Sequence, residues 1–443
     1  MNKITKIVTA AALAAFALPA LSQTNGSNSP YSRYGFGLLG DGANAFNMGM
    51  SGTAYGMRNG TELNSKNSAS YAAIDSLSFL FDFGLSLQNG NIGQNGVKTN
   101  AKNTSIDYIN VGFRAAPRFG MSVGLMPYST IGYNTSTSGT VANTNPEVTR
   151  TTTFSGDGGL HEVYYGLGWA PHRNISIGAN VGYLWGNLSH KVLMSYSESS
   201  INTNRQVYET DVRSYKVDLG LQYVQPINKK NTLTLGFVYG LGHDINTRAD
   251  YFNQTISSGS VTMADTLHAD NAYQLPHTFG LGLTWTHKNS LRVGVDYTFQ
   301  KWGDEKFPEV LTDATGNHTY RATKGQFTDM HKVAMGMEYI PNPEGIRWAQ
   351  RVRYRAGFSF ATPYITRISD GNGNFADGPR DYSASLGVAL PIMNMHNNRS
   401  LLNISAQFEH VAPKAAGMIT ENYLRICVGL SFNERWFMKW KAE

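Results

Sequence analysis

The stretch Leu291-Arg-Val-Gly-Val-Asp-Tyr-Thr-Phe299 alternates strictly: large apolar or aromatic residues occupy the odd positions and Arg, Gly, Asp or Thr the even ones. The stretch Leu424-Arg-Ile-Cys-Val-Gly-Leu-Ser-Phe432 has the same pattern. A period of two predicts a β-strand with one apolar and one polar face. Fourteen such segments, each about nine to twelve residues long and thus able to cross a bilayer, begin near Phe79, Ile106, Met121, Val163, Ile175, Tyr215, Leu233, Phe279, Leu291, Val333, Val352, Tyr382, Leu402 and Leu424.

The polar face separates a transmembrane barrel from a soluble sandwich. A sandwich would carry many Lys and Glu on its outer face, whereas this face holds mostly Gly, Ser, Thr and Asn, which suit a barrel lumen. The few charges on it are expected to pair within the lumen or to meet water. They are Asp82, Arg114, Asp218, Arg292, Asp296, Glu338, Arg353, Arg355, Glu409 and Arg425.

The connections between these segments alternate in length. Residues 88–104, 134–158 and 189–210 form long connections, whereas 116–118 and 171–173 form short ones. Outer-membrane barrels have short periplasmic turns, long extracellular loops and an even number of strands. The sequence therefore predicts an all-β fold, a 14-stranded antiparallel transmembrane β-barrel. Aromatic girdles are expected at Trp169, Tyr183, Trp185, Tyr223, Tyr239, Trp285, Tyr297, Trp302, Tyr339 and Trp436.

The composition excludes two other classes of protein. Of 443 residues, 12% are aromatic and only 15% charged, which is unlike a disordered chain. The mean hydropathy is −0.31, and after residue 22 there is no apolar run of the roughly 20 residues that a membrane helix needs. The 46 glycines and the many Asn, Ser and Thr residues favour strands and turns.

The N-terminus predicts export to the cell outer membrane of a Gram-negative type of cell. Lys3 and Lys6 precede an apolar stretch, and Ala20 and Ser22 suit a cleavage site, so residues 1–22 are read as a signal peptide. Removing these two lysines from the 37 basic residues leaves 35 against 31 acidic ones, a net charge of +4. With no Lys/Arg run, nucleic acid is not an expected partner.

Residues 23–76 do not alternate and are rich in Gly, aromatic residues and Met. We expect this segment to fold as a plug, or hatch, inside a barrel formed by residues 77–443, because a barrel of this size would otherwise enclose an open channel. A free periplasmic tail is the alternative. The apolar side chains of the plug are candidates for a ligand path: Tyr31, Tyr34, Phe36, Phe46, Met48, Met50, Tyr55 and Met57.

The third predicted strand contains Gly124-Leu-Met-Pro127-Tyr128. Proline cannot donate a ladder hydrogen bond and is confined to strand edges and bulges. In a closed barrel, Pro127 is therefore expected to open a local lateral gap with Gly124 and Tyr128. Alternatively, the strand ends there and Pro127 begins a loop.

At these positions the chain resembles the outer-membrane long-chain fatty acid and hydrocarbon transporters of the FadL/TodX type. The segment Asn67-Ser68-Ala69 resembles the Asn-Pro-Ala hatch motif of that family with Ser68 in place of proline, and Gly124, Pro127 and Tyr128 resemble its third-strand pattern. The resemblance implies a fourteen-stranded barrel closed by an N-terminal hatch, capture of a hydrophobic ligand from outside, and lateral release at the third-strand kink. The family also includes a secretion-system shuttle component, so the substrate does not carry over.

Two functions follow as expectations. The first is passive transport of hydrophobic small molecules, either fatty-acid-like compounds or aromatic hydrocarbons. The second is a structural or secretion-associated barrel with no small-molecule transport. An enzyme is not expected, because no Gly-x-Ser-x-Gly elbow or Ser–His spacing is present. Expected partners are the hydrophobic ligand, outer-membrane lipid and lipopolysaccharide, and a protein at the extracellular loops; the chain is expected to be a monomer.

No cofactor or metal is expected. The stretch 370–377 places oxygen ligands at alternate positions, as calcium loops do, but lacks the bidentate Glu of an EF-hand, so a Gly-Asn turn is the simpler interpretation. His161-Glu162 and His243-Asp244 lack a zinc spacing. The single thiol, Cys427, falls on the polar face of its strand and is expected to be a small lumen filler.

Overall fold

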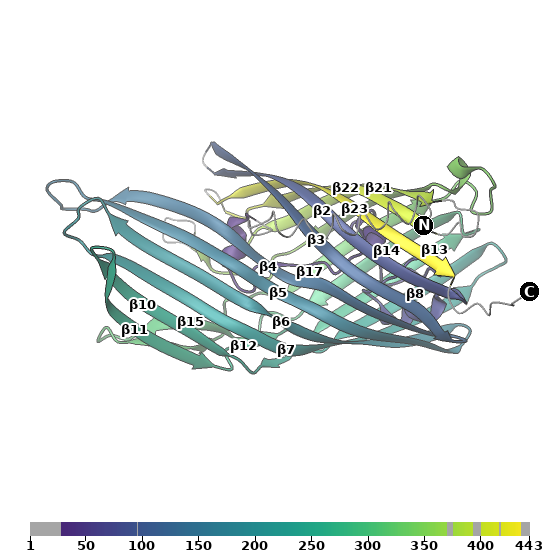
Figure 1. Ribbon diagram of the computed structural model, residues 1–443, viewed down its shortest axis with the longest axis horizontal. Coiled ribbons are helices and arrows are strands. Elements are labelled where there is room, and N and C mark those ends of the chain that lie inside the picture. The colour runs from purple at the N-terminus through teal and green to yellow at the C-terminus, as the bar shows by residue number, and fades with distance from the viewer. Residues whose placement is uncertain (1–27, 95, 370–374, 393–399, 416–417, 436–443) are drawn as a thin grey trace, which may run out of the picture.

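Fourteen antiparallel strands form a closed ring in the computed structural model, which describes residues 28–94, 96–369, 375–392, 400–415 and 418–435 (Figure 1). Each strand pairs with the next along the ring, and the last pairs with the first. The ring strands are β2 (Ser78–Gln94), β3 (Val97–Ala116), β4 (Phe119–Thr140), β5 (Thr149–His172), β6 (Ile175–Tyr196), β7 (Thr203–Pro226), β8 (Asn231–Gly240), β13 (Thr278–His287), β14 (Leu291–Gln300), β17 (Met330–Tyr339), β18 (Arg353–Ala361), β21 (Arg380–Ile392), β22 (Ser400–Ala412) and β23 (Thr420–Arg435).

The outer face of the ring is apolar and exposed. On β5, Val163, Tyr165 and Trp169 are exposed, whereas Glu162 and Tyr164 between them are buried on the inner face. This is the inverse of a soluble protein and is expected of a wall that faces lipid. The predicted fold class is therefore confirmed. Within the described residues, no helix is long and apolar enough to cross a bilayer.

Short turns at one end of the ring and long extensions at the other give its orientation. The turns at 117–118, 173–174 and 288–290 lie at the end where β2 begins and β23 ends, which is the periplasmic end by the usual rule. At the opposite end, β4 to β7 continue beyond the other strands with the hairpin of β10 (Arg248–Ser257) and β11 (Ser260–Asp270), at the left of Figure 1.

The early strands are much longer than predicted. Strands β2 to β7 have 17 to 24 residues, so the expected long connections at 88–104, 134–158 and 189–210 are largely extensions of the strands. These extensions lack apolar alternation because they project beyond the bilayer. Ladder bonds and polar cross-strand pairs stabilise them instead, such as Ser136 with Thr153 and Ser138 with Thr151.

Shorter strands lie at the extracellular end of the barrel. Two strand pairs, β9 (His243–Ile245) with β12 (Tyr273–Leu275) and β15 (Phe307–Thr312) with β16 (His318–Thr323), lie in the connections there, together with β19 (Ile368–Ser369) and β20 (Phe375–Ala376). At the periplasmic end, the connection from β17 to β18 contains η4 (Trp348–Arg351). The predicted signal peptide and residues 370–374 of the calcium-like stretch lie outside the described residues.

Residues 28–77, called here the N-terminal segment, lie against the inner face of the ring, where their purple chain is seen in Figure 1. The segment contains η2 (Pro30–Arg33), β1 (Leu38–Leu39), α2 (Ala45–Met48) and η3 (Ser68–Ala73). Lumen glycines permit this close approach. A Cβ at Gly236 would stand 1.9 Å from the carbonyl oxygen of Tyr55, so any larger residue there would push the segment away.

Six of the ten predicted girdle aromatics are exposed at strand positions: Trp169, Tyr183, Tyr223, Trp285, Tyr297 and Tyr339. The prediction is wrong for Trp302, which is fully buried. It follows β14 at the extracellular end, where its indole packs on Phe36 and Phe327 instead of facing lipid. Trp436 lies outside the described residues.

Candidate functional site

The ladder between β3 and β4 stops partway along the barrel wall. Paired from the periplasmic turn, the two strands separate after Ile109 and Leu125. Beyond this level β3 continues paired only with β2, and β4 continues paired with β5 to Thr140. Among the described residues, the facing edges of β3 and β4 are therefore not joined to one another in the extracellular half of the barrel.

A β-bulge lies on each side of this separation. On β3, Gly84 of β2 pairs with Tyr108 and the next residue pairs with Ile106, so Asp107 is the extra residue. On β4, Pro127 and Ser129 pair with consecutive residues of β5, so Tyr128 is the extra residue. Bulges re-aim side chains and end pairing next to functional sites. Here they turn both strands where the ladder stops.

Strand β1 of the N-terminal segment occupies part of the free edge of β4. Leu38 and Leu39 pair with Thr130 and Ser129, and the amide of Gly40 donates to the carbonyl of Tyr128 at 2.8 Å. A Cβ at Gly40 would stand 2.6 Å from the carbonyl oxygen of Pro127, so this close approach requires glycine. The separation is thus partly covered from within by a two-residue strand.

A cavity of about 650 Å3 lies behind this separation. Its lining includes apolar side chains from both edges and from the N-terminal segment, namely Leu38, Leu39, Met48, Leu85, Ile106 and Met126. It also includes charged side chains, namely Asp41, Asp107, Lys332, Asp381, Glu409, Glu421 and Arg425. The cavity therefore offers both apolar and charged side chains beside the β3–β4 separation.

Asp41 connects the N-terminal segment to the barrel wall within this cavity. Its Oδ1 lies 2.7 Å from Nζ of Lys332 and 3.1 Å from Nζ of Lys66. Burial alone would raise the pKa of Asp41, but the two ammonium groups outweigh it and hold the pKa below its usual value. Asp41 is therefore an ionised carboxylate at neutral pH.

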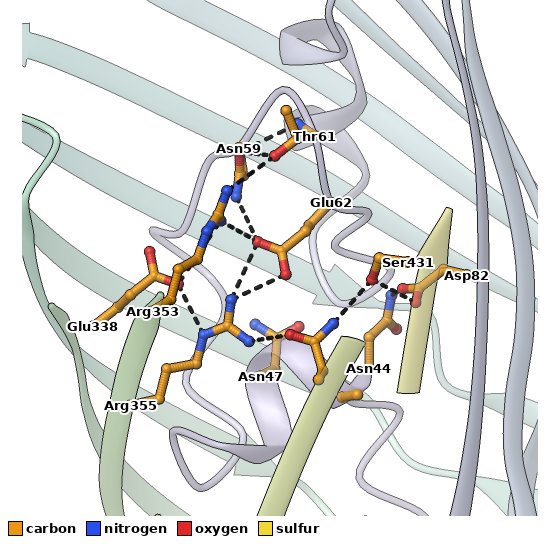
Figure 2. Close-up of polar contacts among 12 residues, drawn as sticks. Asn44, Asn47, Asn59, Thr61, Glu62, Asp82, Glu338, Arg353, Arg355 and Ser431 are labelled. Atoms are coloured by element: carbon orange, nitrogen blue, oxygen red, sulfur yellow. Dashed lines mark hydrogen bonds and ion pairs between the residues drawn. The ribbon is translucent and has the colours of Figure 1, made fainter. Parts of the chain in front are cut away.

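Toward the periplasm, a buried charge network fixes the N-terminal segment (Figure 2). Nη2 of Arg355 lies 3.0 Å from Oε1 of Glu62, and its Nε lies 2.8 Å from Oε2 of Glu338. Arg353 also contacts Glu62, and Nη1 of Arg292 lies 2.9 Å from Oε1 of Glu338. Three arginines thus share two carboxylates, and Glu62 is the one carboxylate of this network that the segment supplies.

Other inward-facing side chains bind the backbone of the segment. Oδ2 of Asp296 accepts the amides of Ala54 and Tyr55, at 2.5 and 2.8 Å. The amide of Gln222 donates to the carbonyls of Tyr55 and Met57, both at 3.0 Å. These bonds tie the segment to inward-facing side chains of β7 and β14.

An aromatic cluster lies at the extracellular end of the barrel. The ring of Trp302 lies 5.6 Å from Phe36, 5.3 Å from Phe327 and 4.9 Å from Tyr364, centroid to centroid. Phe36 belongs to the N-terminal segment, and the other three residues follow β14, precede β17 and follow β18. We call these four residues the aromatic cap.

The predicted ligand-path residues lie in several different surroundings. Tyr31 and Met48 line the cavity, and Phe36 belongs to the aromatic cap. A separate buried cluster contains Phe46, Met50 and Met57. The ring of Tyr34 lies under the guanidinium of Arg33, and Tyr55 Oη is 2.9 Å from the hydroxyl of Thr298.

The hatch-motif residues lie at the start of η3. Asn67 caps this turn, since its Oδ1 accepts the amide of Ala69, and its Nδ2 donates to Tyr55 O at 2.8 Å. Ser68 is buried beside Gly178. Of the third-strand residues, Pro127 and Tyr128 stand where the β3–β4 ladder stops, and Gly124 gives room to the Tyr164 ring.

Several residues that line the cavity were not predicted from the sequence. Asp41, Lys332 and Asp381 carry no local signal, because they meet only through the ring of strands. A sequence signal exists for Asp107: the large apolar residues of this strand are at odd positions from Ile109 onward but at an even position at Ile106, and this change of phase indicates a bulge between them.

Among the described residues, no group of three or more His, Cys, Asp or Glu side chains is arranged to hold a metal ion. In the pair His161-Glu162, which lacks a zinc spacing, Oε2 of Glu162 lies 3.3 Å from Nζ of Lys216. Cys427 is a buried free thiol, as expected for a lumen filler.

A closed fourteen-stranded ring with an apolar exterior defines an integral β-barrel protein of the outer membrane. The chain belongs to the BamG family, whose model matches residues 2–443. Comparison with curated proteins gives no match.

Solved barrels share the fold at low sequence identity. The toluene transporter TbuX of Ralstonia pickettii is 14% identical with a TM-score of 0.59, covering 91% of this chain and 100% of its own. A FadL homologue of Pseudomonas aeruginosa is 13% identical with a TM-score of 0.58, covering 89% and 98%. The monoaromatic hydrocarbon channel CymD is 12% identical with a TM-score of 0.56, covering 92% and 99%. At these identities, the likeness shows a shared barrel fold.

Proposed function

We propose that this protein is a passive outer-membrane channel for hydrophobic small molecules and releases them sideways, between β3 and β4, into the membrane. The observation that carries the proposal is the end of the β3–β4 ladder at Ile109 and Leu125, directly beside the cavity. The likeness to a toluene transporter and a monoaromatic hydrocarbon channel supports the ligand class. We take the N-terminal segment to be the plug of this channel.

The surroundings of the cavity favour a lateral route over a route to the periplasm. Below the cavity, buried ion pairs and backbone hydrogen bonds hold the segment in the lumen. At the side, the edge of β4 pairs with the two residues of β1 and makes one further hydrogen bond each with Gly40 and Ser32. Moving β1 breaks far fewer contacts than withdrawing the plug, and it would uncover a path whose outer end faces lipid.

A disulfide across β1 and β4 tests this route. Leu39 and Ser129 are direct partners in an antiparallel pair, a position whose Cα separation of about 4.5–5.5 Å suits a disulfide. In a Cys427→Ser background, we expect the Leu39→Cys/Ser129→Cys variant to lose most of its uptake of radiolabelled toluene when oxidised and to recover it with reductant.

The control is Asn91→Cys/Asn100→Cys, a directly paired couple on the β2–β3 hairpin outside the separation. Its uptake should not depend on redox state. Equal uptake by the oxidised and reduced Leu39–Ser129 pair would show that β1 does not gate the route.

A second candidate function is a structural or secretion-associated barrel without small-molecule transport. The specific observation in its favour is the buried network of Glu62, Arg355 and Glu338, which immobilises the segment. In that case a deletion strain would take up hydrophobic compounds as the parent does, and the tagged barrel would co-purify with a stoichiometric protein partner. Contacts with lipopolysaccharide and a monomeric state remain predictions.

A further inference from the structure

Carboxyl groups outnumber cationic side chains on the lining of the cavity. Five carboxylates line it, whereas only two cationic side chains of the described chain, Lys332 and Arg425, do so. The carboxylates are Asp41, Asp107, Asp381, Glu409 and Glu421. An apolar molecule gains nothing from such a wall, and a molecule with an anionic head group would add a further negative charge to it.

Three of these carboxylates have partners. Asp41 pairs with Lys332 and with Lys66 from behind. Glu421 accepts hydrogen bonds from the hydroxyls of Ser29 and Tyr423, both at 2.8 Å. Glu409 lies 3.9 Å from Nη2 of Arg425.

Asp107 and Asp381 are not satisfied. Oδ1 of Asp107 accepts from the hydroxyl of Ser86 at 2.8 Å, but its Oδ2 is buried without a partner, and so is Oδ1 of Asp381, among the described residues. Arg425, which lines the same cavity, donates from Nη2 to Oε1 of Gln88 at 3.1 Å, and this nitrogen lies 3.9 Å from Oε2 of Glu409. Its Nε has no partner either, so it does not complete the two carboxylates.

A buried carboxylate oxygen without a donor is costly, and charge-assisted hydrogen bonds are the strongest that can satisfy it. Asp107 is placed here by the bulge in β3, at the edge of the separation. The apolar side chains of Leu85, Ile106 and Met126 line the same cavity toward the β3–β4 edges. The cavity thus has a place for a positively charged donor and, adjoining it, a place for an alkyl chain.

We propose that the cavity binds single-chain amphiphiles with a positively charged amine head group, which donates to the unpartnered oxygen of Asp107 or to that of Asp381 while the chain lies toward the β3–β4 separation. This inference rests on the proposed channel function and narrows its substrate class. It distinguishes the chain from a carrier of anionic fatty acids, because a carboxylate head group would meet uncompensated carboxylates.

The test uses the full-length protein in phosphatidylcholine nanodiscs and three probes with the same twelve-carbon chain: dodecylammonium, dodecanol and dodecanoate. Binding is measured by titration calorimetry at pH 7, with empty nanodiscs subtracted. We expect dodecylammonium to bind at least about tenfold more tightly than dodecanoate, which corresponds to one charge-assisted contact.

The isosteric variant Asp107→Asn/Asp381→Asn should lose this preference. The matched control Asp265→Asn/Asp270→Asn removes two charges from the exposed hairpin strand β11 and should keep it. Because the ranking of probes is measured on the unmodified protein, the test does not depend on the folding of the variants.

The outcomes separate the two proposals. If dodecanoate or dodecanol binds the unmodified protein as tightly as dodecylammonium, the head-group inference is wrong while the channel proposal stands. If no probe binds beyond the empty-nanodisc level, both are wrong. Preference for dodecylammonium that persists in Asp107→Asn/Asp381→Asn would also overturn the assignment of the head-group site.

Discussion

Glu62 joins the N-terminal segment to the barrel through two arginines, and its side chain is almost fully buried. Replacing it with the isosteric Gln leaves three arginines facing Glu338 alone. Breaking a buried pair in this way costs about 3–5 kcal/mol. We expect Glu62→Gln to loosen residues 44–64 without unfolding the ring, which hydrogen exchange of these amides would detect as faster exchange.

The control for this substitution is Glu344→Gln in the periplasmic connection between β17 and β18, where exchange should not change. Equal protection of residues 44–64 in wild type and Glu62→Gln would mean that backbone hydrogen bonds, such as those to Asp296, suffice to hold the segment.

Asp41 gives the attachment of β1 a dependence on pH. Because the folded-state pKa of this carboxyl is below its unfolded value, its ion pairs stabilise the folded segment above the unfolded pKa and are lost as pH falls through the folded pKa. Exchange of the β1 amides should therefore be constant from pH 7 to 5 and rise below the usual aspartate pKa of about 3.9, after correction for intrinsic rates. Asp41→Asn should show the faster exchange at every pH, and an unchanged acid profile in this variant would contradict the role of Asp41.

Strand β1 is held on β4 by backbone contacts that leave no space for side chains at Gly40. We expect Gly40→Val to displace β1 and to widen the β3–β4 separation, measured as increased cysteine labelling at a Ser129→Cys reporter in a Cys427→Ser background. The matched control is Gly139→Val on β4, where an added Cβ would meet nothing within 4 Å. Labelling that rises equally in both variants would point to general loosening of β4.

At the scale of elements, alternation in the sequence predicted the strands. It did not predict the strand extensions, where alternation is absent, or the bulge, where alternation is broken. The stretch Leu291–Phe299 became β14 almost unchanged, because one face meets lipid and the other the lumen. The extensions of β4 and β5 have no lipid to face, so their Thr- and Ser-rich sequences looked like loops. The bulge at Asp107 shifts the phase by one residue, which a fixed period of two cannot follow.

The lumen charges show the same limit. Alternation within each strand predicted that these charges lie on the polar face and pair there. The contact of Arg292 on β14 with Glu338 on β17 is an example. Glu62, the other carboxylate of this network, comes from the N-terminal segment and meets Arg355 only in the folded protein. No spacing in the sequence predicts this contact. Arg114 instead donates to the carbonyl of Ala116 at the periplasmic turn.

At the scale of the whole molecule, the proposed function implies two closures in series along the barrel axis. The aromatic cap would close the extracellular mouth, and the segment held by Glu62 would close the lumen near the periplasm. The cavity beside the β3–β4 separation would then lie between them. A substitution that opens only one of the two closures should leave the route along the barrel axis blocked, because ions must pass both closures to cross the membrane.

Planar-bilayer conductance can test this arrangement with Trp302→Ala and Glu62→Gln, alone and combined. Truncating the buried indole removes about 3–5 kcal/mol of packing from the cap, and Glu62→Gln loosens the segment. We expect each single variant to conduct as little as wild type and the double variant to show frequent channel openings. The surface pair Trp348→Ala/Glu344→Gln, at the periplasmic connection, should remain closed. Openings in Trp302→Ala alone would mean that the segment does not seal the lumen, and the lateral route would then lose its main structural support, since an apolar solute could also pass straight through.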